Sequence, residues 1–340
     1  MSNTRYGAAG VDLARAESAK ERIAALVARA RTANALGRIG GFGGMVRVPP
    51  GMRSPVLVMS TDGVGTKVLV ARAAGRYDTV GEDLVNHSVN DVLVHGARPL
   101  AFLDYLAGSG LGLETIEAIV RGVARGCEAH GMDLAGGETA EMPGLYRPGE
   151  FDLAGTIVGV VEESRAIHGT AIAPGQALVG YESSGLHTNG YSLARRIVFE
   201  EQQLGLDDPL GDTGRSVADA LLAVHRSYYR AVSPVLAEVS GMAHITGGGI
   251  PGNLVRILPE GIEAWINPDR WEIPPLFQHL QRAGNVSTPE MREVFNLGIG
   301  FIAVVPLAWV PRVREAAGEA GVRTWVIGEV RSGPRGVRFE

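Results

Sequence analysis

Three short polar segments in the first half of the sequence carry the side chains best suited to chemistry. They lie at residues 61–67, 90–91 and 136–142. Their carboxylates can hold a hard cation through oxygen, and their glycines let backbone N–H groups approach a phosphate. A lysine supplies a positive counter-charge. A magnesium-bound nucleotide requires these groups, so the sequence favours phosphoryl-transfer chemistry.

The first segment follows an apolar run at 55–59 that predicts a buried strand ending in a loop. Ligands bind at such strand ends in open α/β sheets, so Asp62 is a candidate metal ligand and Lys67 a candidate phosphate contact. The alternative is an ordinary turn in which Asp62 caps its own backbone. The segment is not a Walker loop, because Gly-x-x-x-x-Gly-Lys-[Ser/Thr] does not occur in the sequence.

The second segment places Asn90 and Asp91 between valines, in a helix expected at 82–95 and closed by Gly96. A carboxylate among buried positions needs a partner. A metal ion shared with Asp62 would provide one. The alternative is an ion pair between Asp91 and a histidine four residues away on either side, His87 or His95.

The third segment contains Glu138 and Glu141 in a stretch that we expect to be a loop before Pro143. Two acids in such a loop can bind Mg²⁺ directly or through water, because this ion keeps part of its hydration shell. Alternatively, they are acids at the start of a helix, where the helix dipole favours them.

The second half of the sequence offers polar side chains at a predicted strand-to-helix loop and a histidine before a glycine run. A loop of this kind suits a phosphate monoester, although ordinary capping is an equally common use of these residue types. A lone histidine is more often structural than catalytic. The residues concerned are Ser183, Ser184, His187, Thr188, Asn189 and His244.

A rival hypothesis from another class is a dinucleotide-dependent oxidoreductase. Gly247, Gly249 and Gly252 satisfy the G-x-G-x-x-G spacing after a short apolar segment. That fingerprint belongs to the first βαβ unit of a domain, whereas Pro251 and the turn-rich residues 258–261 interrupt such a plan here.

Composition narrows the remaining classes. The chain has 340 residues, of which 45% are hydrophobic and 20% charged, with a formal net charge of -5. A negative balance argues against a nucleic-acid partner. Cys127 is the single cysteine, which fits a reducing compartment. We read no signal peptide, and the longest apolar stretch, 298–310, is shorter than the ~20 residues of a membrane span. We therefore expect a cytoplasmic protein without a membrane partner.

The order of predicted elements favours an α/β fold with two domains, 1–168 and 169–340. We expect an amphipathic helix at 14–35, and a glycine cluster at 40–44 that is either a turn or a flap. The other main elements are strands at 99–106, 151–161, 177–181 and 298–305, and a helix at 113–130.

Taken in order, these segments resemble the phosphoribosylformylglycinamidine cyclo-ligase family, also called aminoimidazole ribonucleotide synthetase, of purine biosynthesis. The resemblance extends over nearly the whole chain. The matching segments are 9–12, 40–43, 62–67, 90–91, 96–97, 99–100, 102–105, 136–143, 152–155, 183–187, 189–193, 244–249 and 295–296.

The resemblance implies an ATP-dependent ring closure of formylglycinamidine ribonucleotide that yields 5-aminoimidazole ribonucleotide, ADP and phosphate. It also implies a mixed N-terminal sheet that pairs with its twin in a homodimer, and a C-terminal α/β domain that completes the substrate cleft. ATP and Mg²⁺ are the implied cofactors.

The same resemblance assigns roles to individual positions. Asp62, Asp91 and Glu138 would bind the metal, and Asp62, Lys67 and His244 would take part in catalysis, with His244 in proton transfer. The ribonucleotide would contact Ser183, Ser184, His187, Asn189 and His244. ATP would contact Gly41, Phe42, Gly43, Asp62, Gly63, Gly65, Thr66, Lys67, Asn90, Asp91, Glu138 and Thr139.

The sequence departs from the family pattern at Ala8, Ser88, Thr156 and residues 223–228, the last of which replace a stretch that usually contains Pro-Thr. Sister enzymes such as selenophosphate synthetase and thiamine-monophosphate kinase share the acidic sites. A catalytically dead paralogue is the non-enzymatic alternative. It predicts losses among Asp62, Lys67 and Asp91, yet all three are present.

Overall fold

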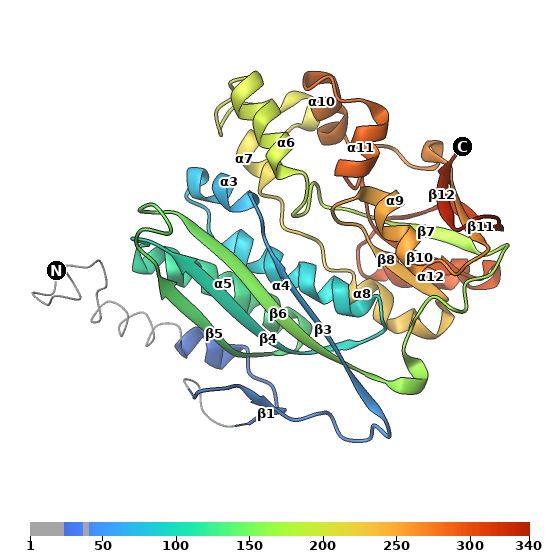
Figure 1. The fold of residues 1–340 in the computed structure, drawn as a ribbon, viewed down its shortest axis with the longest axis horizontal. Coiled ribbons are helices and arrows are strands. Elements are labelled where there is room, and N and C mark those ends of the chain that lie inside the picture. Colours follow the sequence, from blue (N-terminus) through green and yellow to red (C-terminus); the bar gives the residue numbers. More distant parts are fainter. Residues whose placement is uncertain (1–23, 37–40) are drawn as a thin grey trace, which may run out of the picture. The chain divides into compact units, whose positions relative to one another are not determined.

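The protein is described by a computed structural model over residues 24–36 and 41–340. Its contacts divide the chain into two units (Figure 1). The first unit contains the described residues up to Val92 together with Arg98–Val160, and the second contains Leu93–Ala97 and Val161–Glu340. The sequence placed the domain boundary after residue 168, a few residues further along the chain.

A four-stranded mixed sheet forms the centre of the first unit (Figure 1). Its strand order is β3-β6-β4-β5, and β4 pairs in parallel with β5 and antiparallel with β6. The strands are β3 (Pro55–Gly63), β4 (Arg98–Gly108), β5 (Asp133–Glu141) and β6 (Phe151–Glu162). Two short strands, β1 (Ala35–Leu36) and β2 (Met45–Val46), pair separately.

Two helices, α4 (Asp78–Leu93) and α5 (Leu113–His130), cover one face of this sheet (Figure 1). The two helices approach each other closely because each has a glycine at the point of contact. A Cβ on Gly81 of α4 would lie 2.2 Å from the Ile119 carbonyl oxygen, and one on Gly122 of α5 would lie 2.0 Å from that of Asp78. This close packing fixes the position of α4 relative to α5. A shorter helix, α3 (Lys67–Ala74), follows β3.

The opposite face of the first sheet exposes apolar side chains. Leu57 and Met59 of β3 are 48% and 66% exposed, and Leu103 and Tyr105 of β4 are 37% and 42% exposed. Exposed apolar side chains gathered on one sheet face often mark an interaction surface.

A six-stranded sheet with the order β12-β9-β11-β7-β10-β8 forms the second unit. All neighbours are antiparallel except β12 and β9. Alternate residues of its strands enter two separate cores, as Val179 and Leu178 show, so both faces are covered. The strands are β7 (Ala177–Glu182), β8 (Gly241–His244), β9 (Ile262–Ile266), β10 (Ile299–Val305), β11 (Thr324–Ser332) and β12 (Gly336–Phe339).

Helices of the second unit connect these strands (Figure 1). Those used below are α7 (Val217–Leu221), α8 (Tyr229–Val232) and α9 (Gly249–Leu254). The others are α6 (Tyr191–Arg195), α10 (Pro275–Ala283), α11 (Thr288–Val294) and α12 (Val310–Glu319). Among the described residues, no helix has both the length and the apolar character needed to cross a bilayer.

Several predicted elements are confirmed, among them α5, whose bounds match the expected 113–130, and the helix that contains Asp91. Three expectations are wrong. The helix expected over 14–35 ends at residue 29 within its described part, and residues 35–36 are strand β1. Asp62 lies within β3 rather than after it, and the polar segment 136–141 belongs to β5 rather than to a loop. Glycines and acids are rare in buried strands, but both β3 and β5 are edge strands with exposed positions.

The dinucleotide-fold alternative is also wrong. In the described sheet, β8 pairs only with β10, and that pairing is antiparallel. The helix after it, α9, has 6 residues and contains Pro251. The G-x-G-x-x-G match therefore lies outside the parallel βαβ unit that a dinucleotide site requires.

Candidate functional site

The first unit brings Asp62 and Asp91 together around one imidazole. Asp62 comes from the end of β3, whereas His87 and Asp91 lie one turn apart on α4. The His87 Nε2 atom is 2.7 Å from Asp62 Oδ2 and 3.8 Å from Asp91 Oδ2. Two carboxylates that are far apart in sequence therefore converge, and we call these three residues the carboxylate cluster.

Hydrogen bonds fix the orientation of both carboxylates. The Ser60 hydroxyl donates to Asp91 Oδ2 over 3.0 Å, and the Gly63 backbone N–H donates to Asp62 Oδ1 over 2.6 Å. The sequence allowed two alternatives to metal binding, a backbone cap by Asp62 and an ion pair between Asp91 and His87. The hydrogen bond from Gly63 to Asp62 is that cap, and the contact between Asp91 and His87 is that ion pair. Both contacts are present, and they coexist with the convergence of the two acids.

The charges of the carboxylate cluster support one another. Burial alone would raise the pKa of Asp62, but the hydrogen bond and charge of His87 outweigh it, so this pKa is lowered. Burial alone would lower the pKa of His87, but the hydrogen bond to Asp62 and the charges of Asp91 and Asp62 raise it. His87 thus acts as the counter-charge of two acids when no cation is bound.

Lys67 occupies a different place from the one that its sequence context suggested. Its side chain is fully buried, and its Nζ atom lies 2.7 Å from Asp83 Oδ2 on α4. Burial lowers the pKa of Lys67 more than the Asp83 charge raises it. The Lys67 ammonium therefore joins the first turn of α3 to α4, and it is buried rather than exposed to solvent.

Glu138 is not brought to the carboxylate cluster within one chain. Its register partner on β4 is Tyr105, which in turn lies opposite Ala154 of β6. Two residues further along β6, the Thr156 hydroxyl is 3.0 Å from that of Thr61. Glu138 therefore lies on the same face of the sheet as Thr61. Asp62 follows Thr61 along β3, so its side chain points to the opposite face, which the helices cover. Within one chain, strand alternation places Glu138 on the other side of the sheet from Asp62, so the predicted metal role of Glu138 stays a prediction.

The remaining residues expected at the nucleotide lie in varied settings. Phe42 is fully exposed in a bend at 41–43, whereas Asn90 is fully buried on α4. Gly65 has a φ of 66°, which favours glycine over other residues. Exposed positions are also found at Gly41, Gly43, Thr66 and Thr139, and Gly63 is half-buried. Gly40 lies outside the described residues.

In the second unit, hydrogen bonds join the polar loop after β7 to neighbouring segments. The Ser183 hydroxyl donates to Asn296 Oδ1 over 2.9 Å, and the Gly247 backbone N–H donates to Asn189 Oδ1 over the same distance. Ser184 donates its hydroxyl to the Val224 carbonyl. His187 has a φ of 62°, a strained value for a non-glycine residue. The loop is therefore held in one conformation at some energetic cost.

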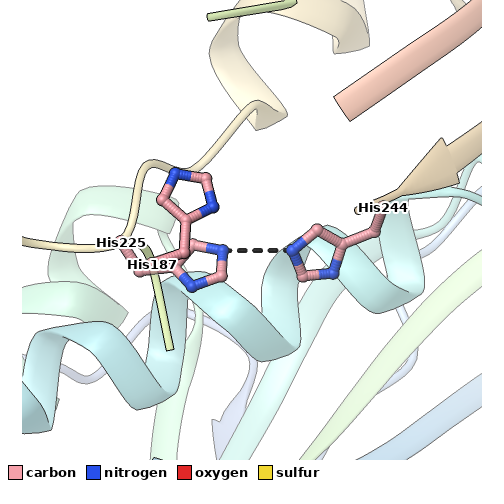
Figure 2. Close-up of side chains that lie close together, drawn as sticks. All are labelled: His187, His225 and His244. Carbon is pink, nitrogen blue, oxygen red and sulfur yellow. Dashed lines mark hydrogen bonds between the residues drawn. The ribbon is translucent and has the colours of Figure 1, made fainter. Parts of the chain in front are cut away.

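Two of the predicted histidines meet a third that sequence reasoning did not single out (Figure 2). The Nε2 atoms of His225 and His244 are 3.0 Å apart, and the rings of His187 and His225 stack with centroids 4.0 Å apart. We call His187, His225 and His244 the histidine cluster. The only signal for His225 in the sequence was its place in the 223–228 departure.

Comparison with known protein families gives two adjoining matches along the chain. Residues 44–161 match the family described as AIR synthase related protein, N-terminal domain, and residues 173–339 match its C-terminal domain.

Curated relatives cover nearly the whole chain. A phosphoribosylformylglycinamidine cyclo-ligase from Sorangium cellulosum is 50% identical over 331 residues, which are 96% of this chain and 95% of the relative. One from Thermosynechococcus vestitus is 46% identical over 96% of each chain. The chain belongs to the phosphoribosylformylglycinamidine cyclo-ligase family. This family membership agrees with the resemblance seen in the ordered motifs.

Solved structures show that the cyclo-ligase family shares its fold with other proteins. Thiamine-monophosphate kinase from Stenotrophomonas maltophilia matches with a TM-score of 0.70 and 18% identity, covering 94% of this chain and 95% of the kinase. The hydrogenase maturation protein HypE in complex with ATP matches with a TM-score of 0.67 and 18% identity, covering 93% and 88%. At this identity, the comparison supports the two-domain α/β fold alone.

Proposed function

We propose that this chain catalyses the ATP-dependent cyclisation of formylglycinamidine ribonucleotide to 5-aminoimidazole ribonucleotide in purine biosynthesis. The observation that carries the proposal is the match of 46–50% identity over nearly the full length of relatives named for this reaction. The convergence of Asp62 and Asp91 supports the proposal, because an enzyme that uses a magnesium-bound nucleotide needs neighbouring carboxylates to bind the metal ion.

The proposed reaction requires the protein to align its two substrates, and it requires no nucleophile from the protein. The formyl oxygen is a poor leaving group until the γ-phosphoryl group of ATP is transferred to it, which releases ADP. A nitrogen of the substrate that becomes part of the ring then attacks the formyl carbon and loses a proton, the carbon–oxygen bond breaks, and phosphate leaves with that oxygen. The protein must hold two substrates in line and neutralise charge on the transferred group.

Mg²⁺ fits the donor set of the carboxylate cluster. Asp62 and Asp91 offer carboxylate oxygens, and the Ser60 hydroxyl lies 3.0 Å from Asp91. Hard oxygen donors of this kind suit Mg²⁺. We propose that Asp62 and Asp91 hold this ion, which when bound neutralises phosphate charge. His87 supplies the positive charge for the two acids in the free protein.

Backbone amides and α4 complete the proposed nucleotide site. We assign phosphate contacts to the segment of Gly63, Gly65 and Thr66, which follows the carboxylate of Asp62. Asn90, Thr139 and the glycine-rich bend at 41–43 remain predicted ATP contacts. Lys67 enters the proposal as a residue that positions α3 through its buried pair with Asp83. Glu138 is assigned no metal contact from the same chain.

The polar loop of the second unit is the proposed site for the ribonucleotide. Ser183, Ser184 and Asn189 contribute hydroxyl and amide groups, and His187 has a strained backbone of the kind that is retained at binding loops. His244 is our candidate for proton transfer.

We further propose that the chain acts as a cytoplasmic homodimer. The exposed apolar face of β3 and β4 supports this, because a second copy would bury Met59 and its neighbours. Sedimentation of the purified protein tests the dimer. A Met59→Lys variant should sediment as a monomer, and a dimer that survives this change would place the interface elsewhere.

One assay tests the proposed reaction. The full chain is incubated with ATP, Mg²⁺ and formylglycinamidine ribonucleotide, and both ADP and aminoimidazole ribonucleotide are measured. We expect both products in equal amounts and only when the ribonucleotide is present. Thiamine monophosphate serves as a control substrate, because a kinase of the same fold would consume it. A folded protein that forms neither product, beside an active relative, would contradict the proposal and favour a non-catalytic paralogue.

A further inference from the structure

Three separate segments of the second unit bring imidazoles to one point (Figure 2). His187 lies in the loop after β7, His225 between α7 and α8, and His244 at the end of β8. All three are buried, with exposed fractions of 0%, 0% and 6%. One ring nitrogen from each histidine can be chosen so that all three lie within 4.8 Å of one another.

The contacts of these rings show that they carry lone pairs as well as protons. The Ser184 backbone N–H donates to His187 Nε2 over 3.2 Å, so that nitrogen is unprotonated. The Nε2 atoms of His225 and His244 face each other at 3.0 Å, so at least one of them accepts. The hydroxyl of Thr188 lies 3.3 Å from His225 Nδ1, on the far side of the ring from His244. Neutral imidazole is the form that binds metal ions, and a ligating histidine is oriented when its other ring nitrogen donates a hydrogen bond, as His225 Nδ1 can donate to Thr188. The lone pair of His187 Nε2 would bind an ion in place of the Ser184 hydrogen bond.

We propose that His187, His225 and His244 form a binding site for a divalent transition-metal ion of the Zn²⁺ type. Imidazole nitrogen is a preferred ligand of Zn²⁺, whereas Mg²⁺ prefers oxygen. Nitrogens on a tetrahedral Zn²⁺ lie about 3.3 Å apart, given Zn–N distances of ~2.0–2.1 Å. The His225 to His244 separation is already close to this value. The His187 ring stacks on His225 at an interplanar angle of 23°, so it must turn out of the stack to direct a nitrogen at the same ion.

Three protein ligands leave one coordination position open for water or a small ligand. Two of the three histidines are also the ones that we place at the ribonucleotide. A bound transition-metal ion would therefore compete with that role. The site itself does not depend on the proposed reaction, because its test measures ion binding by the free protein.

The experiment uses the full chain without a polyhistidine tag, stripped with a chelator and kept in excess Mg²⁺. Zn²⁺ is titrated by calorimetry, and Co²⁺ is titrated by visible absorption. We expect one equivalent of Zn²⁺ per chain that Mg²⁺ does not displace, and a Co²⁺ spectrum typical of nitrogen ligands. Binding should weaken as the pH falls, since protons compete for the imidazoles.

A matched pair of variants separates this site from surface binding. His225→Gln keeps a polar side chain but removes the ring, and it should lower Zn²⁺ affinity by at least ~10-fold. His168→Gln removes an exposed imidazole of the same unit and should leave the affinity unchanged. X-ray absorption of the Zn²⁺-loaded wild type gives a readout without any variant, and we expect three imidazoles around the ion.

Three results would overturn the inference. The first is a wild type that binds no Zn²⁺ in excess Mg²⁺. The second is a folded His225→Gln variant with wild-type affinity. The third is an absorption spectrum with fewer than three imidazoles, which also decides the question if the variant does not fold.

Discussion

The two side-chain clusters of this protein differ in their donor atoms and in the elements that hold them. The carboxylate cluster stands on a strand and a long helix, and its single imidazole, His87, pairs with acids. The histidine cluster comes from two loops and one strand end, and its hydrogen bonds include one between two imidazoles and others with a hydroxyl and a backbone N–H.

This difference predicts opposite metal preferences in one chain. The first cluster offers oxygen and a negative charge, which suit Mg²⁺, and the second offers imidazole nitrogen, which suits Zn²⁺. The comparison also shows two ways in which polar groups can be buried. In the first, opposite charges offset the cost of burial, and in the second, the buried rings hydrogen-bond to one another and to neighbouring groups.

The largest expected effect comes from removing one carboxylate of the first cluster. Asp62→Asn keeps the size of the side chain but removes its charge, so cyclisation should fall by roughly 10³-fold or more. Steady-state assays and a thermal melt of the same sample measure activity and folding. Asp212→Asn is the control, because Asp212 is an exposed acid paired with Arg282. Near-normal activity of the Asp62 variant would remove this residue from the metal site.

A carboxyl whose pKa is set by burial rather than by an imidazole sharpens the comparison. Burial raises the pKa of Asp104 on β4 to about 7. The folded state then binds more protons than the unfolded state above pH ~4, so the free energy of unfolding should fall as pH rises from about 4 to about 7. The total change is of the order of 4 kcal/mol, at ~1.4 kcal/mol per pKa unit.

Urea unfolding at a series of pH values measures this dependence. Asp104→Asn should flatten the curve over the same range, since amides do not titrate. Cys127 is the neighbouring titratable group, and its thiol stays protonated throughout because burial raises its pKa. An unchanged slope in the variant would show that other groups cause the dependence.

The helix contact tests whether the carboxylate cluster depends on packing. Gly122→Ala places a methyl group 2.0 Å from the Asp78 carbonyl oxygen, so it should destabilise the protein by ~1–3 kcal/mol and lower activity. Gly318→Ala on α12 is the control, since its Cβ would meet no atom within 4 Å. Equal melting temperatures for the two variants would argue against the close helix contact.

The smallest effect concerns Cys127, the one thiol that could compete for Zn²⁺. It is fully buried on α5, and burial raises its pKa well above the usual range, so thiolate is scarce. Cys127→Ser should leave Zn²⁺ affinity within ~2-fold of wild type, while the native thiol reacts at least ~10-fold more slowly with Ellman's reagent than the unfolded one. A loss of Zn²⁺ binding in this variant would move the site to the cysteine.

Local patterns were sufficient for much of the fold. The apolar spacing of 113–130 gave α5 at both ends, because Gly131 stops the helix with a φ of 59°. The alternation of elements gave the α/β class, and ordered motifs gave the family. The edge strand β5 was missed because its glycines and acids lack the alternation of a half-buried strand.

The candidate sites were predictable in part. The sequence singles out Asp62 and Asp91, which converge in the structure, and also His187 and His244. Lys67 and Glu138 were assigned to the same site, yet one is buried against Asp83 and the other lies on the opposite sheet face. His225 was passed over, because nothing in a single sequence indicates which distant histidines become neighbours.

The sequence by itself determined which donor groups the chain possesses and which local segments present them, since residue types and short-range periodicity are encoded in order along the chain. Only the tertiary structure decided which donors meet. Strand alternation separated Glu138 from Asp62, helix packing buried Lys67, and three connections of different length brought His187, His225 and His244 together. Such contacts depend on how elements pack across long separations, and no local pattern carries that information.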